Sequence, residues 1–404
     1  MDGGNASAEP SLTRRELIGA TAGTLACTTL DDQSRPRTIR LGLIGCGQRG
    51  AWIGGLFARH GGFEVYAVAD YFADVADRCG EQLSVPVARR FSGLNGYKRL
   101  MASGVEAVAL ETPPYCFPPH AHEAVRTGLH VFMAKPVAVD VPGCRAIEAA
   151  AEEATRRGLT FLVDYQIPTD PNNIEVVENI RRGAIGKIVT AHSYYLARSW
   201  PDPPKGKTIE GRLQHLIWVN DTAIGSGYHG NACIHAIDAV LWAVGKVPVA
   251  AMGLSRIGRP DPHGDSHDTL SLTYDFGGGL FLNHRAKHLP DQYSTADFCG
   301  CYIHGTAGYA WLSYSARAQL LSETESVSRD VQNLYEAGAV RNIAAFYKAI
   351  TQRDASNPTV ARSVAGALTT ILGREAALRG RRLTMAEILR ENKRLPLDLK
   401  GLRP

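Results

Sequence analysis

Three glycines at positions 45, 47 and 50 form the segment Gly45-Cys46-Gly47-Gln48-Arg49-Gly50, directly after the apolar run 39–44. Between a strand and a helix, the first glycine permits a tight turn, the second lets the backbone approach a pyrophosphate, and the third allows close helix packing. The start of the helix adds unpaired N–H groups and positive potential. With the helix-like sequence from Ala51, the segment predicts a dinucleotide site rather than a tight turn alone.

An acidic residue completes this predicted site. Asp70 ends the next apolar run, twenty positions after Gly50, where its carboxylate would accept hydrogen bonds from both ribose hydroxyls. The same charge would repel the 2′-phosphate of NADP, and no arginine follows Asp70 immediately. The pattern therefore favours NAD over NADP. Thr112-Pro113-Pro114, after the run 105–110, would lie along the nicotinamide side of the cleft, although a rigid turn fits this tripeptide equally well.

Two basic side chains further along the chain could act on a substrate. Lys135 lies between the run 130–133 and Pro136. A lysine beside the nicotinamide, in contact with the cofactor, can donate to a substrate oxygen and stabilise alkoxide charge. Burial or a neighbouring cation would lower its pKa toward neutrality. His235 could remove a hydroxyl proton, since the unperturbed pKa of histidine is near neutral.

Polar residues close to His235 in sequence leave alternatives open. His229 is a rival base or a substrate ligand. Asn231 would precede His235 by one turn on the same helix face, where it could orient the imidazole or bind a sugar hydroxyl. Asp238 could fix the imidazole ring, or it could serve as a helix-surface carboxylate.

Substrate contacts are expected from Gln166, at the exit from the first domain, and from Arg212, beside the long polar segment that begins at Trp200. Lys207 and His215 lie in or beside the same segment. A polyhydroxyl ligand needs several such donors and acceptors. The eight cysteines show no paired Cys-x-x-Cys spacing, so neither a metal site nor a disulfide framework is predicted.

Length and composition bound the scaffold that must position these residues. The chain has 404 residues, of which 45% are apolar and 21% charged, with a net charge of +4. These values are typical of a globular protein with more than one domain. No basic stripe with interleaved aromatic residues indicates nucleic acid as a partner. No apolar run approaches the roughly 20 residues of a membrane span.

Strands that alternate with helices up to residue 164 predict an α/β fold, with an N-terminal Rossmann domain at 38–164 built on a parallel sheet. From 165 to 404 the pattern changes to an α+β domain on an open, mainly antiparallel sheet, whose C-terminal helices could pack back on the first domain. The predicted elements are strands at 39–44, 64–69, 105–110, 130–133, 160–163, 187–195, 270–274 and 280–283, helices at 172–182 and 359–378, and a loop at 200–211.

Residues 1–37 are expected to form a signal and a linker. Thr13-Arg14-Arg15-Glu16-Leu17-Ile18 precedes a weakly apolar stretch that ends at Leu30. This layout is typical of a twin-arginine export signal, and a frayed helix is the alternative. Export to the periplasm of a folded, cofactor-loaded protein suits a dinucleotide enzyme. Cleavage is placed near Ala26, and lipid anchoring at Cys27 is a minor alternative.

As a set, these motifs resemble the glucose–fructose oxidoreductase, inositol dehydrogenase and MocA (Gfo/Idh/MocA) family. The resemblance rests on 45–50 with Asp70, on 112–114, on 130–136 and on 235–238. It implies a two-domain dehydrogenase in which Lys135 and His235 act on the substrate, and a homo-oligomer assembled through the second sheet. The chain departs from the family at Ala134, where a glutamate is usual, and at Asn231, where an acid is usual.

The sequence therefore predicts an enzyme that transfers hydride between a secondary alcohol of a sugar, cyclitol or glycoside and NAD. Because an exported protein has no ready pool of free NAD, an alternative is a glycosidase or lyase that keeps its NAD bound and oxidises the sugar only transiently. A second alternative is a non-catalytic sugar-binding protein that has lost the acids replaced at Ala134 and Asn231.

Overall fold

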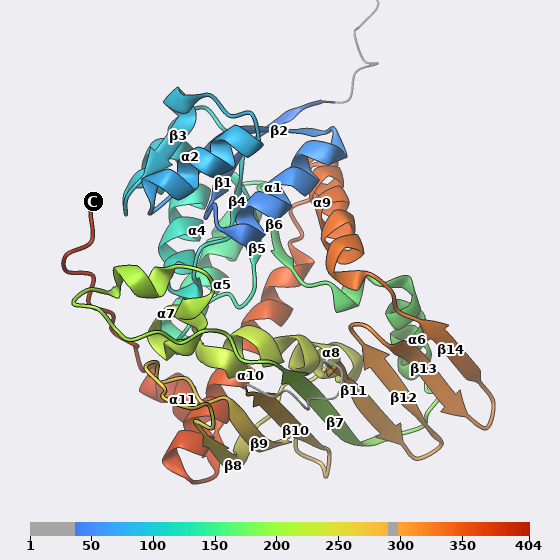
Figure 1. Ribbon diagram of the computed structural model, residues 1–404. Coiled ribbons are helices and arrows are strands. Elements are labelled where there is room, and N and C mark those ends of the chain that lie inside the picture. The colour runs from blue at the N-terminus through green and yellow to red at the C-terminus, as the bar shows by residue number, and fades with distance from the viewer. Residues whose placement is uncertain (1–36, 290–297) are drawn as a thin grey trace, which may run out of the picture. The chain divides into compact units, whose positions relative to one another are not determined.

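The computed structural model describes residues 37–289 and 298–404 (Figure 1). The predicted twin-arginine segment and Cys27 lie outside these residues, so the expectations for them remain predictions. Residues 37–404 form one unit by their contacts. None of the helices in the described ranges combines the length and the apolar character that crossing a membrane requires.

The first half of this unit is built on a six-stranded parallel sheet in the order β3-β2-β1-β4-β5-β6. Its central strands β1, β4 and β5 are buried along almost their whole length, as expected for a sheet covered on both faces. The Rossmann fold expected from the sequence is thus confirmed. The strands are β1 Ile39–Ile44, β2 Phe63–Asp70, β3 Arg90–Ser92, β4 Ala107–Leu110, β5 His130–Ala134 and β6 Phe161–Asp164.

The order of the strands reverses between β1 and β4: β2 and β3 lie on one side of β1, and β4, β5 and β6 lie on the other. In open α/β sheets the crevice at such a point, outside the carboxyl ends of the strands, is where ligands bind. Helix α1 begins at Gln48, three residues before the predicted start, because the chain becomes helical directly after Gly47. The helices and short turns of this half are α1 Gln48–His60, α2 Ala73–Gln82, η1 Val87–Arg89, α3 Gly96–Met101, η2 Pro114–Cys116, α4 Phe117–Arg126 and α5 Val141–Arg156.

A nine-stranded sheet forms the second half, in the order β14-β13-β12-β11-β7-β10-β9-β8-β15. Among the described strands of this sheet only β7 and β10 pair in parallel, and the other pairs are antiparallel, so the expected mainly antiparallel sheet is confirmed. The predicted hairpin between β9 and β10 turns through three glycines with positive φ, 277–279. The strands are β7 Ile188–Ala197, β8 Ala250–Arg256, β9 Thr269–Asp275, β10 Phe281–His288, β11 Phe298–Gly305, β12 Gly308–Ser313, β13 Arg317–Ser322, β14 Ser326–Asp330 and β15 Leu383–Thr384.

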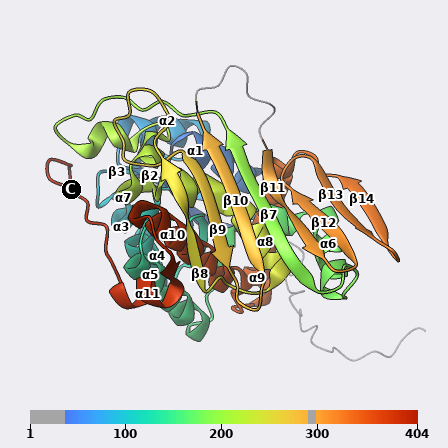
Figure 2. The same cartoon turned by 90° about the horizontal axis from the view of Figure 1, so that it is seen from below.

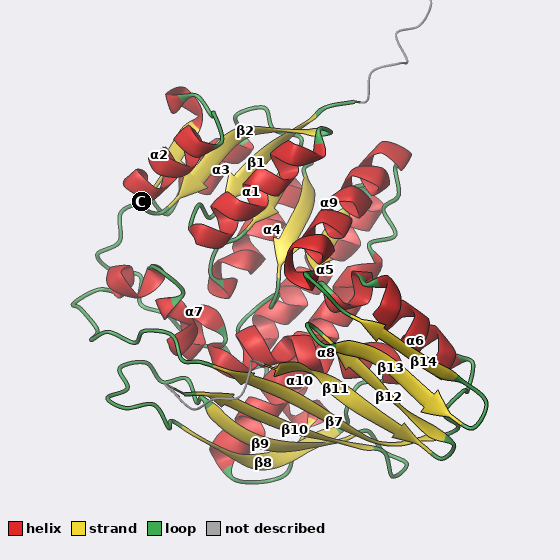
Figure 3. Cartoon of the chain, turned by 45° about the vertical axis from the view of Figure 1, so that its right-hand side comes forward, coloured by secondary structure: helices red, strands yellow, loops and turns green. Residues whose placement is uncertain are grey.

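Helices α6, α8 and α10 cover one face of this sheet, and in Figure 2 no described helix lies over the other face. Figure 3 shows these helices between the two sheets. The helices and turns of this half are η3 Ile167–Thr169, α6 Pro171–Arg181, η4 Ile209–Leu213, η5 Ile217–Asn220, α7 Thr222–Gly225, η6 His229–Cys233, α8 Ile234–Val244, α9 Leu334–Gln352, α10 Pro358–Arg379 and α11 Met385–Glu391.

Two late helices return to the Rossmann sheet. Helix α10 contacts α5 and β6, and α9 lies beside α1 (Figure 1). Phe346 of α9 is fully buried and packs its ring against Phe63 and Phe132, with centroids 6.0 and 5.7 Å apart. One face of the first sheet is therefore completed by chain that follows β14 of the second sheet.

Candidate functional site

In the glycine turn, positions 45 and 50 have no room for a side chain, whereas position 47 faces open space. A Cβ on Gly50 would lie 1.8 Å from the carbonyl oxygen of Gly45, and Gly45 itself has a φ of +96°. A Cβ on Gly47 would meet no atom within 4 Å. Helix α1 begins directly after Gly47, without a side-chain cap and without an acidic residue in its first turn. The turn therefore fits the pyrophosphate of a dinucleotide.

Asp70 is held beside this turn by two backbone N–H groups. Oδ2 accepts from Cys46 N at 2.8 Å, and Oδ1 accepts from Phe72 N at 3.0 Å. Burial raises the pKa of Asp70, and these bonds oppose that shift. Each carboxylate oxygen keeps a lone pair for a ribose hydroxyl. Cys46 thus serves the site through its backbone, because its thiol is buried and donates to Ala69 O at 3.4 Å.

The remaining residues of the predicted cofactor set take up different places. Gln48 is exposed at the first position of α1. Thr112 follows Glu111 at the carboxyl end of β4, where its N would lie 2.7 Å from a Cβ on Gly45. Pro113 is half-buried and precedes the short turn η2. All three therefore lie at or next to the crevice outside the carboxyl edge of the sheet.

Arg49 turns its side chain across the carboxyl edge of the sheet. Nε donates to Glu111 Oε2 at 3.1 Å, and the guanidinium also binds Asp164 and the hydroxyl of Tyr335, the latter at 2.8 Å. The Glu111 and Asp164 side chains are only 1% and 0% exposed. Burial raises the pKa of Glu111 to about 7, against the opposing charge of Arg49. Arg49 is thus part of a buried charge cluster rather than a side chain directed only at phosphate.

These two acids are functional candidates that sequence reasoning missed. Glu111 directly follows β4, and Asp164 ends β6. The carboxyl ends of parallel strands meet at one edge of a sheet, so acids at these two points could have been predicted to converge. In the strand register Asp164 lies opposite Ala134. A neighbouring strand therefore supplies a carboxylate beside the position where the family glutamate is missing.

Lys135 follows β5 at the same edge. Its Nζ donates to the backbone oxygen of Asn231 at 2.6 Å, a contact that joins the two halves of the unit. Burial lowers the pKa of Lys135 to about 7, and the positive charge of Arg49 acts in the same direction, while Asp164 and Glu111 oppose it. Lys135 can therefore both hold and release a proton near neutral pH.

His235 lies in the first turn of α8 and is partly exposed. Its ring centroid is 5.3 Å from that of Tyr314 and 6.1 Å from that of Tyr165. Its pKa is lowered by burial first, then by the positive charges of Lys135 and Arg49. The imidazole is therefore neutral at pH 7 and able to accept a proton.

Asn231 precedes His235 by four positions, as the sequence shows, but the two residues belong to different helical segments. Residues His229–Cys233 form a π-helical turn, η6, and His235 lies in the first turn of α8, which follows it directly. Asn231 instead contributes its backbone oxygen to Lys135.

Gln166 is buried within the charge cluster. Its Nε2 donates to Asp164 Oδ2 at 2.8 Å, and its Oε1 accepts from the Tyr314 hydroxyl at 3.0 Å. Asn342 of α9 donates to the other oxygen of Asp164 at 2.7 Å. Gln166 therefore positions Asp164 and Tyr314, and its own side chain is occupied by these bonds.

Arg212 does not act as the expected substrate contact. It is 2% exposed, and its guanidinium binds Asp202 and Asp221, each at 2.6 Å, as well as the carbonyl of Pro203. Opposite buried charges satisfy the guanidinium, so Arg212 holds the long loop in place. Lys207 and His215 are exposed on that loop.

His229 and Asp238 are not placed for the roles considered above, a base or substrate ligand for His229 and a partner of the His235 ring for Asp238. His229 is 3% exposed, and its Nε2 lies 2.8 Å from the hydroxyl of Tyr274 on β9. Asp238 is fully buried and pairs with Arg362 of α10 at 3.0 Å instead of fixing His235. Both residues therefore have partners within the core.

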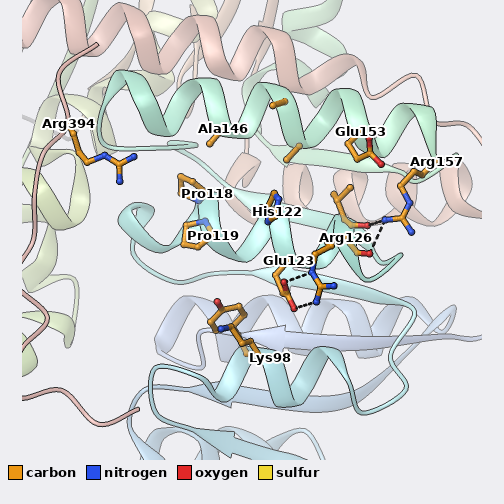
Figure 4. Close-up of a pocket in the computed structure, with 14 residues that line it drawn as sticks. Lys98, Pro118, Pro119, His122, Glu123, Arg126, Ala146, Glu153, Arg157 and Arg394 are labelled. Atoms are coloured by element: carbon orange, nitrogen blue, oxygen red, sulfur yellow. Dashed lines mark hydrogen bonds and ion pairs between the residues drawn. The ribbon is translucent and has the colours of Figure 1, made fainter. Parts of the chain in front are cut away.

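A hollow of about 880 Å³ lies elsewhere, on the outside of the Rossmann half. It is lined by α3, α4 and α5 and by the chain near Arg394, and its polar groups include Glu123 and Arg126, which pair at 2.7 Å (Figure 4). None of the predicted site residues lines it. The convergence of charged groups at the sheet edge, rather than this hollow, identifies the candidate site.

Comparisons with known proteins match both halves of the chain. The family model described as "Oxidoreductase family, NAD-binding Rossmann fold" matches residues 39–164. The model described as "GFO/IDH/MocA C-terminal domain" matches residues 174–311.

Curated relatives and solved structures are more distant. A 2,7-anhydro-N-acetylneuraminate hydratase of Escherichia coli (strain K12) is 26% identical over 60% of this chain and 59% of the relative. A glycosyl hydrolase family 109 protein of Shewanella pealeana is 26% identical over 39% of this chain and 35% of the relative. The chain therefore spans less than two thirds of the length of these two relatives. Levoglucosan dehydrogenase, solved with NADH and levoglucosan, shares the fold with a TM-score of 0.70 and 18% identity, over 86% of this chain and 100% of that one.

Proposed function

Since this chain belongs to the Gfo/Idh/MocA oxidoreductase family, we propose that it is an NAD-dependent dehydrogenase of a secondary alcohol in a sugar, cyclitol or glycoside. The proposal rests on one juxtaposition. The carboxyl edge of one parallel sheet carries the open turn at Gly47, the clamped carboxylate of Asp70 and the half-buried Lys135. His235 faces the same cluster through Tyr314 and Gln166.

When NAD is bound at this edge, its nicotinamide ring supplies the two-electron acceptor or donor. Gly47 and the start of α1 hold the pyrophosphate, and Asp70 binds the adenosine ribose. Asp70 is raised in pKa by burial but bonded twice by backbone N–H groups, which favour its charged form. These residues bind and orient the cofactor without taking part in proton transfer.

Lys135 and His235 have different roles at the substrate oxygen. Neutral His235 accepts the hydroxyl proton as the carbon is oxidised, and Lys135 donates a hydrogen bond that stabilises negative charge on the oxygen. The pKa of Lys135, lowered to about 7, suits a group that exchanges protons at neutral pH. Asp164 and Glu111 offset the charges of Arg49 and Lys135, which would otherwise repel each other in a buried place.

A second candidate function is cleavage or hydration through transient oxidation with retained NAD. The curated relatives include a protein named for hydration and one named for glycoside hydrolysis. The same residues serve this reaction, because a carbonyl formed beside a C–H bond acidifies it and permits elimination. The chemistry differs only in that the electrons return to the sugar before release.

Two further features of the protein are proposed with this function. Export through the twin-arginine route is supported by Arg14 and Arg15 in the layout described above. Assembly into a homo-oligomer through the outer face of the second sheet is supported by exposed apolar side chains there, including Met252, Leu254 and Phe281 at 49%, 75% and 41% exposure.

The test begins with the full chain purified in its native state. Native mass spectrometry should show bound NAD, or NAD uptake from solution, and a subunit number above one. A screen of sugars, cyclitols and glycosides should then yield NADH in equal amount to a keto product. Glycoside cleavage without net NADH would favour the second candidate instead. A protein that takes up neither NAD nor NADP would refute both.

A further inference from the structure

A second group of chemically active side chains lies between helix and sheet, apart from the charge cluster. His229 and Cys233 occupy the first and last positions of the π-helical turn η6, and His284 lies on β10. One ligand atom from each of the three residues lies within 4.8 Å of the others. His229 is 3% exposed, and Cys233 and His284 are fully buried. The spacing approaches that of atoms that share a metal ion.

The two imidazoles each have one nitrogen bonded and one without a partner. His229 Nε2 lies 2.8 Å from the Tyr274 hydroxyl, and His284 Nδ1 lies 2.8 Å from the Ser193 hydroxyl. His229 Nδ1 and His284 Nε2 are buried and have no hydrogen-bond partner among the described residues. Metal-bound histidines characteristically use the second ring nitrogen to bind a polar group of the protein. Both rings show that arrangement.

The backbone around the group is shaped to bring it together. The π-helical turn places His229 and Cys233 on the side facing the sheet, and such turns are frequent at functional sites. Tyr274 reaches His229 because position 373 on α10 is a glycine, whose Cβ would lie 2.0 Å from the Tyr274 hydroxyl oxygen. Sheet, π turn and helix α10 thus all contribute to the packing around one small group of polar side chains.

We propose that His229 Nδ1, His284 Nε2 and Cys233 Sγ bind one thiophilic cation, Zn²⁺ or Cu⁺. Thiolate and imidazole ligands select these ions over Mg²⁺, Ca²⁺ and Mn²⁺, which prefer oxygen. No carboxylate joins the group within the described ranges. Binding replaces the thiol proton of Cys233, which leaves to solvent, and changes no oxidation state. This site could not be predicted from the sequence, because Cys233 and His284 are 51 positions apart and no Cys-x-x-Cys spacing occurs.

A cation here would fix the segment that supports Lys135. Asn231, midway between His229 and Cys233, provides the carbonyl that accepts from Lys135 Nζ at 2.6 Å. His235 follows Cys233 by two positions. The metal would therefore be a structural ion that holds η6 against the sheet, and it would not touch the substrate.

The first experiment uses the unmodified chain without a histidine tag. Elemental analysis and native mass spectrometry should show one Zn²⁺ or one Cu⁺ per chain, either as purified or after addition of each metal alone under reducing conditions. Replacement by Co²⁺ should give the charge-transfer absorption of a cobalt–thiolate bond. Less than about a tenth of an equivalent after both additions, or bound Co²⁺ without that absorption, would overturn the proposal.

Variants then locate the site. Cys233→Ser and His284→Gln should abolish stoichiometric uptake, and Ser193→Ala should weaken it by roughly tenfold or more, as loss of an outer-shell bond does. Cys301→Ser and His288→Gln are matched controls, since both residues are buried in the same sheet outside the group and should keep one equivalent. Uptake unchanged in both ligand variants would refute the site. If those variants do not fold, Ser193→Ala and the cobalt spectrum of the unmodified chain decide.

Discussion

Replacing Gly47 by alanine separates cofactor binding from folding. The methyl group would enter open space, because a Cβ at this position meets no atom within 4 Å. The backbone angles of Gly47, φ −63° and ψ −174°, are accessible to alanine. Alanine reduces the conformational freedom of the unfolded chain, which stabilises the folded protein by about 0.4–1 kcal/mol. As an N-cap residue, however, alanine is less favourable than glycine by a similar free energy. The unfolding free energy of Gly47→Ala should stay within about 1 kcal/mol of that of the parent.

NAD affinity should fall in the same variant. The methyl group would occupy the space through which the pyrophosphate approaches the backbone and would lengthen at least one charge-assisted hydrogen bond, worth about 1.5–3 kcal/mol. That loss corresponds to a roughly 10–150-fold increase in Kd. Isothermal titration calorimetry with NAD gives Kd, and urea unfolding without NAD gives the stability.

Gly50→Ala is the matched control with the opposite expectation. Its Cβ would lie 1.8 Å from the backbone oxygen of Gly45, so the turn itself must shift, at a cost of about 1–3 kcal/mol or more in unfolding free energy. If Gly47→Ala bound NAD as tightly as the parent chain, the pyrophosphate would not lie against this turn, and the assignment of the cofactor site would be refuted.

Three further changes test the site and its support. Lys135→Met should lower kcat by about 10²–10⁴-fold while leaving the Kd for NAD within a few-fold, as steady-state kinetics and calorimetry would show. The pKa of Lys135 is lowered to about 7 in the folded chain and is about 10.4 in the unfolded chain. Between these pH values the unfolded state binds more protons, so the contribution of Lys135 to the unfolding free energy increases as the pH rises. Lys135→Met should remove this part of the slope of unfolding free energy against pH, measured by urea unfolding, and an unchanged slope would contradict the argument that burial lowers this pKa. Arg212→Ala should lower the unfolding free energy by about 3–5 kcal/mol, since Asp202 and Asp221 lose a buried partner, and a thermal shift no larger than that of a surface variant would argue against the loop clamp. Asp70→Asn should weaken NAD more than NADP in calorimetry, because it removes the carboxylate that binds the ribose and repels a 2′-phosphate.

The fold and the cofactor-binding turn could be predicted from the sequence because the residues that define them lie close together along the chain. A glycine motif, the strand before it and the acid after it follow in a single βαβ stretch, so position along the chain predicts position in space. The strand Arg90–Ser92 escaped prediction because it has three half-buried residues and only one apolar side chain. The early start of α1 at Gln48 is likewise a boundary that periodicity does not fix.

The candidate substrate site was harder to predict because it depends on residues from distant elements. Arginine is a residue type that often binds substrates, but the guanidinium of Arg212 is buried and paired with Asp202 and Asp221. The role of Asn231 rests on its carbonyl oxygen, which every residue type carries, and on a π-helical turn that spacing alone does not reveal. Glu111 and Asp164 become partners of Arg49 only when the parallel strands are aligned.

The packing of α9 on α1 bears on the order in which the protein is made. The Rossmann half is synthesised first, but its core includes Ile343, Phe346 and Ile350, which emerge from the ribosome nearly two hundred residues after β6 ends at Asp164. Until that helix arrives, the surface of α1 and of the sheet that Phe346 covers, with Phe57, Phe63 and Phe132, lacks its packing partner. A fragment that stops at the end of β6 would expose this surface, so the nascent nucleotide-binding half is expected to depend on chaperones until synthesis is almost complete.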